Sequence, residues 1–182
     1  CGDQVASFKS QAPLDVPNTF RSDLAGIYGA YLGVQEALAD DRLSDAVAAW
    51  EAVRSALDAV EPAGLGTREA GAWRQAATKL AENLDAEFKH EDVDDVRAKF
   101  EGLAMSMIDL VAAFGHVEEA GLARAYCPMA FNNRGAAWLQ SGEKIANPYF
   151  GHKMLRCGEI QRTFSPATET AASTDPTPEE RP

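Results

Sequence analysis

The stretch VDDVRAKFEGLAMSMIDLVAAFG, residues 93–115, carries the clearest helical pattern in the sequence and decides the expected fold. Its large apolar side chains recur at alternating steps of three and four residues, which places them on one face of an α-helix. Gly115 directly follows the last of them and is a residue type that commonly ends helices. The buried face is expected to consist of Val93, Val96, Phe100, Leu103, Met107, Leu110 and Phe114.

Three further amphipathic helices are expected upstream of this one. The first begins near Asn18 or Thr19, which are good N-terminal caps. The second ends at Pro62, Thr67 is expected to cap the third, and a short helical piece over 117–125 leads out of the fourth. Four such helices predict an antiparallel up-and-down four-helix bundle, and no alternating strand pattern competes, so the expected fold class is all-α. The apolar positions are Phe20, Leu24, Ile27, Tyr28, Tyr31, Leu32 and Leu38, then Leu43, Val47, Trp50, Val53, Leu57 and Val60, then Trp73, Ala77, Leu80, Leu84 and Phe88.

The helical domain is expected to span residues 18–164, with a tail at each end. A chain of 182 residues is long enough for one domain with its own core. Residues 1–17 have no sustained apolar period and contain two prolines, so they are interpreted as a tether. Residues 165–182 have no large apolar side chain and contain four prolines, which predicts a disordered tail.

The net charge and the first residue bear on where the protein works. The formal net charge of −11 argues against nucleic acid as a partner, because phosphate binding needs clustered Lys and Arg. No apolar run reaches the length of a membrane span. The chain begins with Cys1, which is typical of the mature end of a bacterial lipoprotein, where that thiol carries lipid; the other interpretation is an arbitrary boundary. A lipoprotein would work outside the cytoplasm, where paired cysteines can oxidise.

Residues 126–160, YCPMAFNNRGAAWLQSGEKIANPYFGHKMLRCGEI, hold the candidate site. Pro128, the turn at 132–135 and the pair at 147–148 argue against a long regular helix. We therefore expect the bundle to be followed by an irregular Cys- and Met-containing segment, and a long irregular segment in a compact domain is often functional. The aromatic side chains expected to anchor it to the bundle are Trp138, Tyr149 and Phe150.

Five side chains of this segment are candidate ligands of a soft metal ion. Cys127 and Met129 are two residues apart and point the same way if that piece is extended. Met154 and Cys157 are three apart and share a face if the chain there makes a helical turn, with His152 at its edge. Thiolates and thioethers are soft donors that select Cu(I) and its relatives over hard cations.

A disulfide between Cys127 and Cys157 is the alternative, because two cysteines in an exported protein most often pair. It would close a loop of 30 residues and stabilise the fold by roughly 3–4 kcal/mol on a chain-entropy estimate. The residues alone leave both interpretations open. The sequence contains no Cys-x-x-Cys pair and no nucleophile–base motif, so it does not predict an enzyme.

Two other polar groups have structural explanations. His116 follows the end of the fourth helix and is expected to cap it rather than to bind a ligand. Acidic residues before a helix complement its dipole, so the acidic group ahead of the fourth helix is expected to be a solvated face. Its members are Glu87, Glu91, Asp92, Asp94 and Asp95.

Four short motifs occur in a familiar order: Cys127-Pro128-Met129-Ala130, Gly135-Ala136-Ala137-Trp138-Leu139, Asn147-Pro148-Tyr149-Phe150-Gly151 and Met154-Leu155-x-Cys157-Gly158. With the upstream helices, they make residues 19–160 similar to an uncharacterised bacterial periplasmic domain. That domain is found in stand-alone exported proteins and lipoproteins, and at the C-terminal end of adaptor (membrane fusion) proteins of copper/silver-type heavy-metal efflux pumps. The resemblance implies a helical domain linked to copper or related metals. The positions it transfers are Cys127, Met129, Met154 and Cys157, and His152 is added on chemical grounds.

The resulting expectation is a stand-alone periplasmic accessory protein that holds Cu(I) or Ag(I) for storage or transfer in heavy-metal efflux or resistance. A lipid on Cys1 would be its only link to the membrane. Its partner would be a heavy-metal efflux system or another envelope protein. The alternative is a structural or interaction module of the cell envelope that is stapled by a disulfide and holds no metal.

Overall fold

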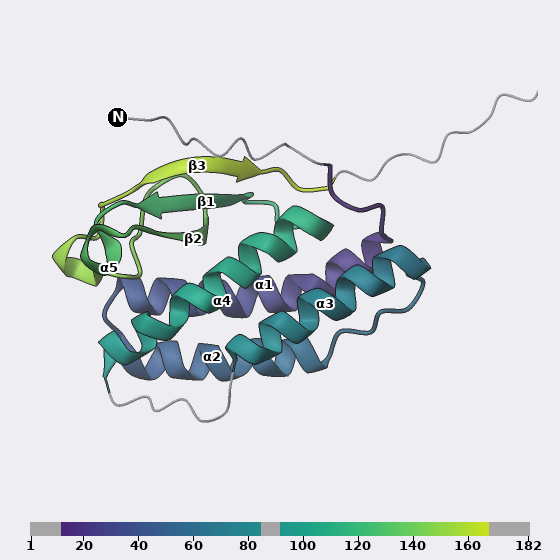
Figure 1. The fold of residues 1–182 in the computed structure, drawn as a ribbon, viewed down its shortest axis with the longest axis horizontal. Coiled ribbons are helices and arrows are strands. Elements are labelled where there is room, and N and C mark those ends of the chain that lie inside the picture. Colours follow the sequence, from purple (N-terminus) through teal and green to yellow (C-terminus); the bar gives the residue numbers. More distant parts are fainter. Residues whose placement is uncertain (1–11, 85–91, 168–182) are drawn as a thin grey trace, which may run out of the picture.

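The computed structural model describes residues 12–84 and 92–167, and these contain four long helices and a small sheet (Figure 1). The four helices lie where the apolar spacing predicts them. Phe88, expected on the inner face of the third helix, lies outside the described residues, as do Glu87 and Glu91 of the acidic group. The long helices are α1 (Asn18–Ala39), α2 (Leu43–Asp58), α3 (Thr67–Asn83) and α4 (Val93–Phe114).

Helix α4 begins and ends as its sequence predicts. The Asp92 carboxylate accepts hydrogen bonds from the backbone amides of Asp94 and Asp95, at 2.8 and 2.9 Å, and so caps the first turn. Gly115 follows the helix with a φ of 72°, a conformation that glycine adopts without strain. The apolar residues at most 1 % exposed include Val96, Phe100, Leu103, Met107, Leu110 and Phe114.

The prediction of an all-α fold is wrong, because an antiparallel three-stranded sheet follows the helices. Its strands are ordered β2-β1-β3, so β1 lies in the middle. Residues 122–125, which the sequence suggests are helical, belong to β1, and the expected irregular segment 126–160 contains the end of β1, the whole of β2 and the start of β3. The strands are β1 (Leu122–Cys127), β2 (Ala136–Ser141) and β3 (Glu159–Phe164).

The sequences of these strands do not show the regular alternation of apolar and polar residues that reveals a half-buried strand. Every residue of β2 from Ala136 to Gln140 is buried, so apolar and polar residues have no reason to alternate along it. Strand β3 does alternate in burial, but one of its less exposed positions is Arg162, which weakens the apolar pattern. A strand buried on both faces cannot be told from a short helix by periodicity alone.

Helices and sheet share one hydrophobic core. In Figure 1 the sheet lies along one side of α1 and α4. Between them, the rings of Tyr31 and Phe100 stack with centroids 5.5 Å apart. The ring of Tyr149 then contacts the rings of Phe100 and of Trp138 in β2, with centroids 5.8 and 6.0 Å away. The Leu139 amide of β2 also donates to the Tyr31 hydroxyl at 3.0 Å, so the sheet is joined to the helices by polar as well as apolar contacts.

The described part of the expected tether packs against the helices. The Leu14 amide donates to the Ala113 carbonyl at 2.7 Å, and Val16 is 4 % exposed. The Arg21 guanidinium donates to the Phe114 carbonyl at 2.9 Å and closes the end of α4. Residues 12–17 therefore run along the domain instead of leaving it.

The two chain ends lie largely outside the described residues. Cys1, the expected lipidation site, is among residues 1–11, and most of the expected tail falls in 168–182. The three described tail residues include Ala167, whose amide donates to the His116 carbonyl at 2.8 Å. In the part of the chain that the structure describes, no helix is both long and apolar enough to span a bilayer.

Candidate functional site

The sheet brings Cys127 and Cys157 together. Cys127 is the last residue of β1 and is buried, whereas Cys157 lies two residues before β3 and is partly exposed. Because β1 and β3 are antiparallel neighbours with Tyr126 opposite Glu159, the two cysteines lie at the same end of the sheet. Their Sγ atoms are 2.8 Å apart, although the residues are 30 positions apart in the sequence. Both the metal and the disulfide interpretations depend on this meeting.

The backbone of Cys157 is held from both sides. Its amide donates to the Met154 carbonyl at 2.9 Å, and its carbonyl accepts from the side-chain amide of buried Asn147 at 2.7 Å. Gly158 follows with a φ of 135°, and a Cβ at that position would lie 2.9 Å from the Trp138 ring, too close for any larger residue. These contacts keep the Cys157 sulfur next to Cys127.

The turn after Cys127 is strained. Three of the four residues of α5 (Ala130–Asn133) have φ values between 50° and 66°, a region that asparagine tolerates and that is unfavourable for Phe131. The backbone strain at Phe131 is compensated by the packing of its ring. The ring centroid lies 5.3 Å from that of Tyr149 and 4.9 Å from the guanidinium carbon of Arg134. Arg134 in turn makes two hydrogen bonds to Glu101 of α4, at 2.7 and 2.6 Å. The turn shape is thus imposed by tertiary contacts.

The two methionines of the predicted site lie on the chain segments that follow Cys127 and precede Cys157. Met129 follows β1, its side chain is 46 % exposed, and its backbone amide hydrogen-bonds to the Cys157 sulfur. Met154 is partly exposed and comes directly after a single 3-10 turn, η1 (Gly151–Lys153). Because the helical geometry ends at that turn, Met154 and Cys157 do not share a helix face.

The sulfur separation and the thiol pKa constrain the chemistry. Burial raises the pKa of the Cys157 thiol to about 11 and the adjacent Cys127 acts in the same direction, whereas the Met129 hydrogen bond partly offsets both. At neutral pH Cys157 is therefore a thiol, and metal binding to its sulfur would release a proton. Two thiolates on one tetrahedral metal with bonds of about 2.3 Å lie about 3.8 Å apart, whereas a disulfide needs about 2.05 Å. The observed 2.8 Å lies between these values, somewhat nearer to the disulfide.

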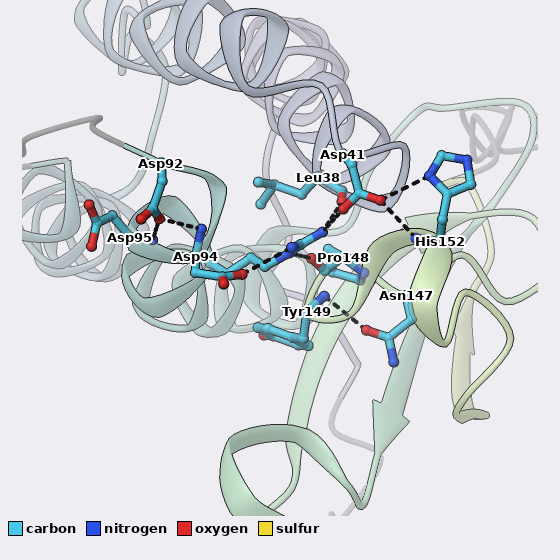
Figure 2. A network of polar contacts seen from close by, with 10 residues as sticks. Leu38, Asp41, Asp92, Asp94, Asp95, Asn147, Pro148, Tyr149 and His152 are labelled. Atoms are coloured by element: carbon cyan, nitrogen blue, oxygen red, sulfur yellow. Dashed lines mark hydrogen bonds and ion pairs between the residues drawn. The ribbon is translucent and has the colours of Figure 1, made fainter.

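A buried arginine, Arg97, docks the loop between β2 and β3 on the helices, and Figure 2 shows its partners Leu38, Asp41 and Pro148. Arg97 of α4 is 5 % exposed, and its guanidinium donates to the carbonyls of Pro148, at 2.8 Å, and Leu38, at 2.9 Å. It also pairs with Asp41. The Asp41 carboxylate accepts from the His152 backbone amide at 3.0 Å and lies 2.9 Å from His152 Nδ1. The end of α1, the start of α4 and the loop are thereby joined.

This network binds His152, one of the predicted metal ligands, and leaves no space for a side chain at Gly151. One of the two ring nitrogens of His152 is held by the Asp41 carboxylate, so this nitrogen is not available to a metal ion at the cysteines. Gly151 has a φ of 56°, and a Cβ there would overlap Asp41 and Arg97. Among residues 12–84 and 92–167, no cluster of three or more His, Cys, Asp and Glu side chains is arranged to hold a metal ion.

Sequence reasoning missed the docking role of Arg97 and Asp41, although one signal was present. Arg97 lies four residues after Val93 and three before Phe100, so it occupies the apolar stripe of α4. A charged residue on such a stripe is seldom buried unless it is paired. Asp41 gives no comparable signal, because it is one of two adjacent aspartates just after α1.

The aromatic residues expected to anchor the segment differ in burial. Trp138 and Tyr149 are buried, whereas Phe150 is partly exposed.

Acid is expected to weaken this docking. The hydrogen bond from Arg97 lowers the pKa of the Asp41 carboxyl from 3.8 to about 2, and the His152 hydrogen bonds add to the effect. A carboxyl whose pKa is depressed on folding contributes stability above its unfolded pKa and loses it as the pH falls towards the folded value. The contribution should therefore be constant near pH 5 and above, and should disappear between about pH 4 and 2. Solvent screening keeps it modest, since the Asp41 side chain is 37 % exposed.

The matched variant for this prediction is Asp41→Asn, because asparagine tolerates the positive φ of 56° at this position. The free energy of unfolding of both proteins would be measured from pH 6 to pH 2. The difference between them should shrink only in the acid range. A difference that stays constant down to pH 2 would show that the Asp41 carboxylate is not coupled to folding.

The chain was also compared with known proteins. No curated protein and no solved structure matches it. A family model matches residues 27–119, which run from within α1 to the segment before β1, so both cysteines of the site lie outside the matched residues. The match confirms an uncharacterised domain in the helical part of the chain. Since it covers just over half of the sequence, the chain belongs to the family described as "Protein of unknown function (DUF3347)".

Proposed function

We propose that this protein is a non-enzymatic metal-binding accessory protein that holds a soft ion, Cu(I) or Ag(I), between the thiolates of Cys127 and Cys157. The observation that carries the proposal is that these two sulfurs, 30 residues apart in the sequence, meet at one end of the sheet. One of them is partly exposed, so an ion has access from solvent. Thiolates are the donors that favour Cu(I) and its relatives over hard cations.

Further donors lie in the chain segments that flank the pair. The exposed Met129 thioether sits on the turn whose backbone contacts the Cys157 sulfur, and Met154 hydrogen-bonds through its carbonyl to the Cys157 amide. A flexible thioether at the rim suits ligand exchange, in which an ion is passed to a partner without being released to solvent. His152 would join only if it left Asp41 or used its second ring nitrogen. Loading would also require the sulfurs to separate by about 1 Å.

The cellular context is proposed from the resemblance of the four motifs. It favours the periplasm or cell envelope, a lipid anchor on Cys1, and a heavy-metal efflux system or another envelope protein as partner. The soft-donor chemistry of the site agrees with that context, because copper and silver efflux needs proteins that hold these ions while excluding hard cations.

A titration tests the metal proposal. Reduced full-length protein competing with a Cu(I) chelator is expected to retain about one ion per chain, because two thiolates form the site. Cys127→Ser should lower the affinity at least tenfold, since it removes one of two thiolates. Cys1→Ser is the matched control, because it removes a thiol from outside the site and should leave the affinity unchanged. No retention by the reduced protein, or equal effects of the two substitutions, would rule the proposal out.

A second candidate function is a disulfide-stapled structural or interaction module without metal. The sulfur separation favours it specifically, since 2.8 Å is shorter than the spacing of two sulfurs on one metal ion. The staple would fix the loop between β2 and β3, on which the partly exposed Phe150 is available to a partner, whereas Trp138 and Tyr149 are buried in the core. Free thiols counted on protein taken from its native compartment discriminate the two candidates. Two free thiols in addition to Cys1 argue against the staple. The absence of any free thiol other than Cys1 argues for it.

A further inference from the structure

We propose that Cys157 is a thiol-exchange site at which a low-molecular-weight disulfide, such as oxidised glutathione, reacts first, and that Cys127 completes the exchange by closing an intramolecular disulfide. This inference concerns regulation of the site under "Proposed function" and rests on that same pair of cysteines, but not on metal binding. It gives the two cysteines unequal roles, which neither the metal nor the staple proposal requires.

The unequal roles follow from burial. Cys127 is 0 % exposed at the end of β1, whereas Cys157 is partly exposed on the loop before β3. Thiol–disulfide exchange needs direct contact between the attacking sulfur and the disulfide. A tripeptide disulfide can reach Cys157 in the folded protein, but it can reach Cys127 only if the local structure opens.

Proximity determines the second step. The Cys127 sulfur lies 2.8 Å from the Cys157 sulfur, and the Cys157 backbone is held by Met154 and Asn147. A mixed disulfide on Cys157 would therefore form with its resolving thiol already beside it. Such positioning gives intramolecular reactions a large advantage over attack by a second molecule from solution.

The exchange is balanced in atoms and electrons. The Cys157 thiolate attacks one sulfur of oxidised glutathione, so a Cys157–glutathione disulfide forms and the first glutathione leaves as a thiolate. The Cys127 thiolate then attacks the Cys157 sulfur, the bond to glutathione breaks, and a second glutathione leaves. The two cysteines lose two electrons, oxidised glutathione gains them, and the two cysteine protons end on the two reduced glutathione molecules.

The disulfide and a bound metal ion exclude each other at this site. A Cys127–Cys157 disulfide consumes both thiolates, so the oxidised protein cannot hold a soft metal ion through them. Reduced glutathione can reverse the reaction by attacking the same exposed sulfur, with Cys127 as the leaving thiol. Redox exchange at Cys157 would thus set the fraction of protein that is able to bind metal.

The experiment uses the full chain carrying Cys1→Ser, without metal, treated with oxidised glutathione and followed by intact mass and peptide mapping. With Cys127→Ser added, a stable glutathione adduct should accumulate on Cys157. With Cys157→Ser added, Cys127 should react at least tenfold more slowly than Cys157 does, because it must wait for local opening. With both cysteines present, the product should be the intramolecular disulfide and the adduct should not accumulate.

Two further measurements keep the result interpretable. Brief reaction of the chain with both cysteines, quenched by acid, should show glutathione on the Cys157 peptide, which gives the order of reaction without a destabilising substitution. In denaturant, the two single-cysteine chains should react at similar rates. Equal rates in the folded state, early adduct on Cys127, accumulation of adduct in the two-cysteine chain, or a rate difference that survives denaturant would each overturn the inference. A chain that exchanges as expected but does not retain Cu(I) would overturn only the metal proposal.

Discussion

Replacing Arg97 with methionine is expected to lower the free energy of unfolding by about 3–5 kcal/mol, because two buried carbonyls lose their charged donor and one of them, that of Leu38, keeps only the Asp41 amide at 3.3 Å. These are the carbonyls of Pro148 and Leu38, which accept from the guanidinium at 2.8 and 2.9 Å. The ion pairs with Asp41 and Asp94 add less, since those carboxylates are 37 % and 75 % exposed and are screened by solvent. Methionine has a similar stem, so the loss would report hydrogen bonding rather than volume.

Arg97→Lys is the matched control for this prediction. An ammonium keeps the positive charge but is compact, whereas the planar guanidinium donates in several fixed directions to both carbonyls and both aspartates. The lysine variant should therefore recover only part of the lost stability. Urea denaturation followed by circular dichroism gives the free energies. Full recovery by lysine would show that charge alone docks the loop, and a loss below about 1 kcal/mol for methionine would show that the network is not a major stabilising element.

The same substitution has a readout at the cysteines. Pro148 and His152 belong to the loop that positions Cys157, and both are held by the Arg97–Asp41 pair. Loosening that loop should make the Cys157 sulfur spend less time next to Cys127. The intramolecular disulfide should then form more slowly from a Cys157–glutathione adduct in the Arg97→Met protein than in the unchanged protein. An unchanged rate would show that the loop near Cys157 is positioned by Asn147 and Gly158 alone.

How much the sequence predicts depends on how local the determining interactions are. The helices were predictable because their burial pattern repeats within each segment, and the glycine that ends α4 is a local signal. The sheet was not, because its strands are defined by pairing over long separations, such as Tyr126 with Glu159, and by burial on both faces of β2. Tertiary structure there outweighs what the local pattern indicates.

The candidate site shows the same division. That Cys127 and Cys157 form a pair could be expected from their number and their shared segment, and the structure brings their sulfurs together. The orientation of the thioethers was inferred from assumed extended and helical geometry. The chain instead turns after Cys127 and leaves helical geometry at Met154, so those inferences had no basis in the actual backbone. The contact between His152 and Asp41 joins residues 111 positions apart, which no spacing rule could indicate.

Trp138→Ala is expected to lower the free energy of unfolding by about 3–5 kcal/mol and to do so for helices and sheet together. Trp138 is 0 % exposed and packs edge-on against Tyr149, which contacts Phe100 of α4. The sequence alone suggested that such an anchor holds a separate segment on an independent bundle. Because the core is continuous from β2 to α4, the cavity left by the indole should destabilise one cooperative unit.

The measurement is urea denaturation by circular dichroism combined with native-state hydrogen exchange. A single transition with an unchanged dependence on urea, and parallel loss of protection in α4 and β1, is the expected result. Phe150→Ala is the matched control, because that ring is an aromatic neighbour in the same part of the chain but is partly exposed, so its removal should cost clearly less. If protection is lost only in residues 122–164 while the helices persist, the sheet is a separate folding unit and the shared core does not couple the two.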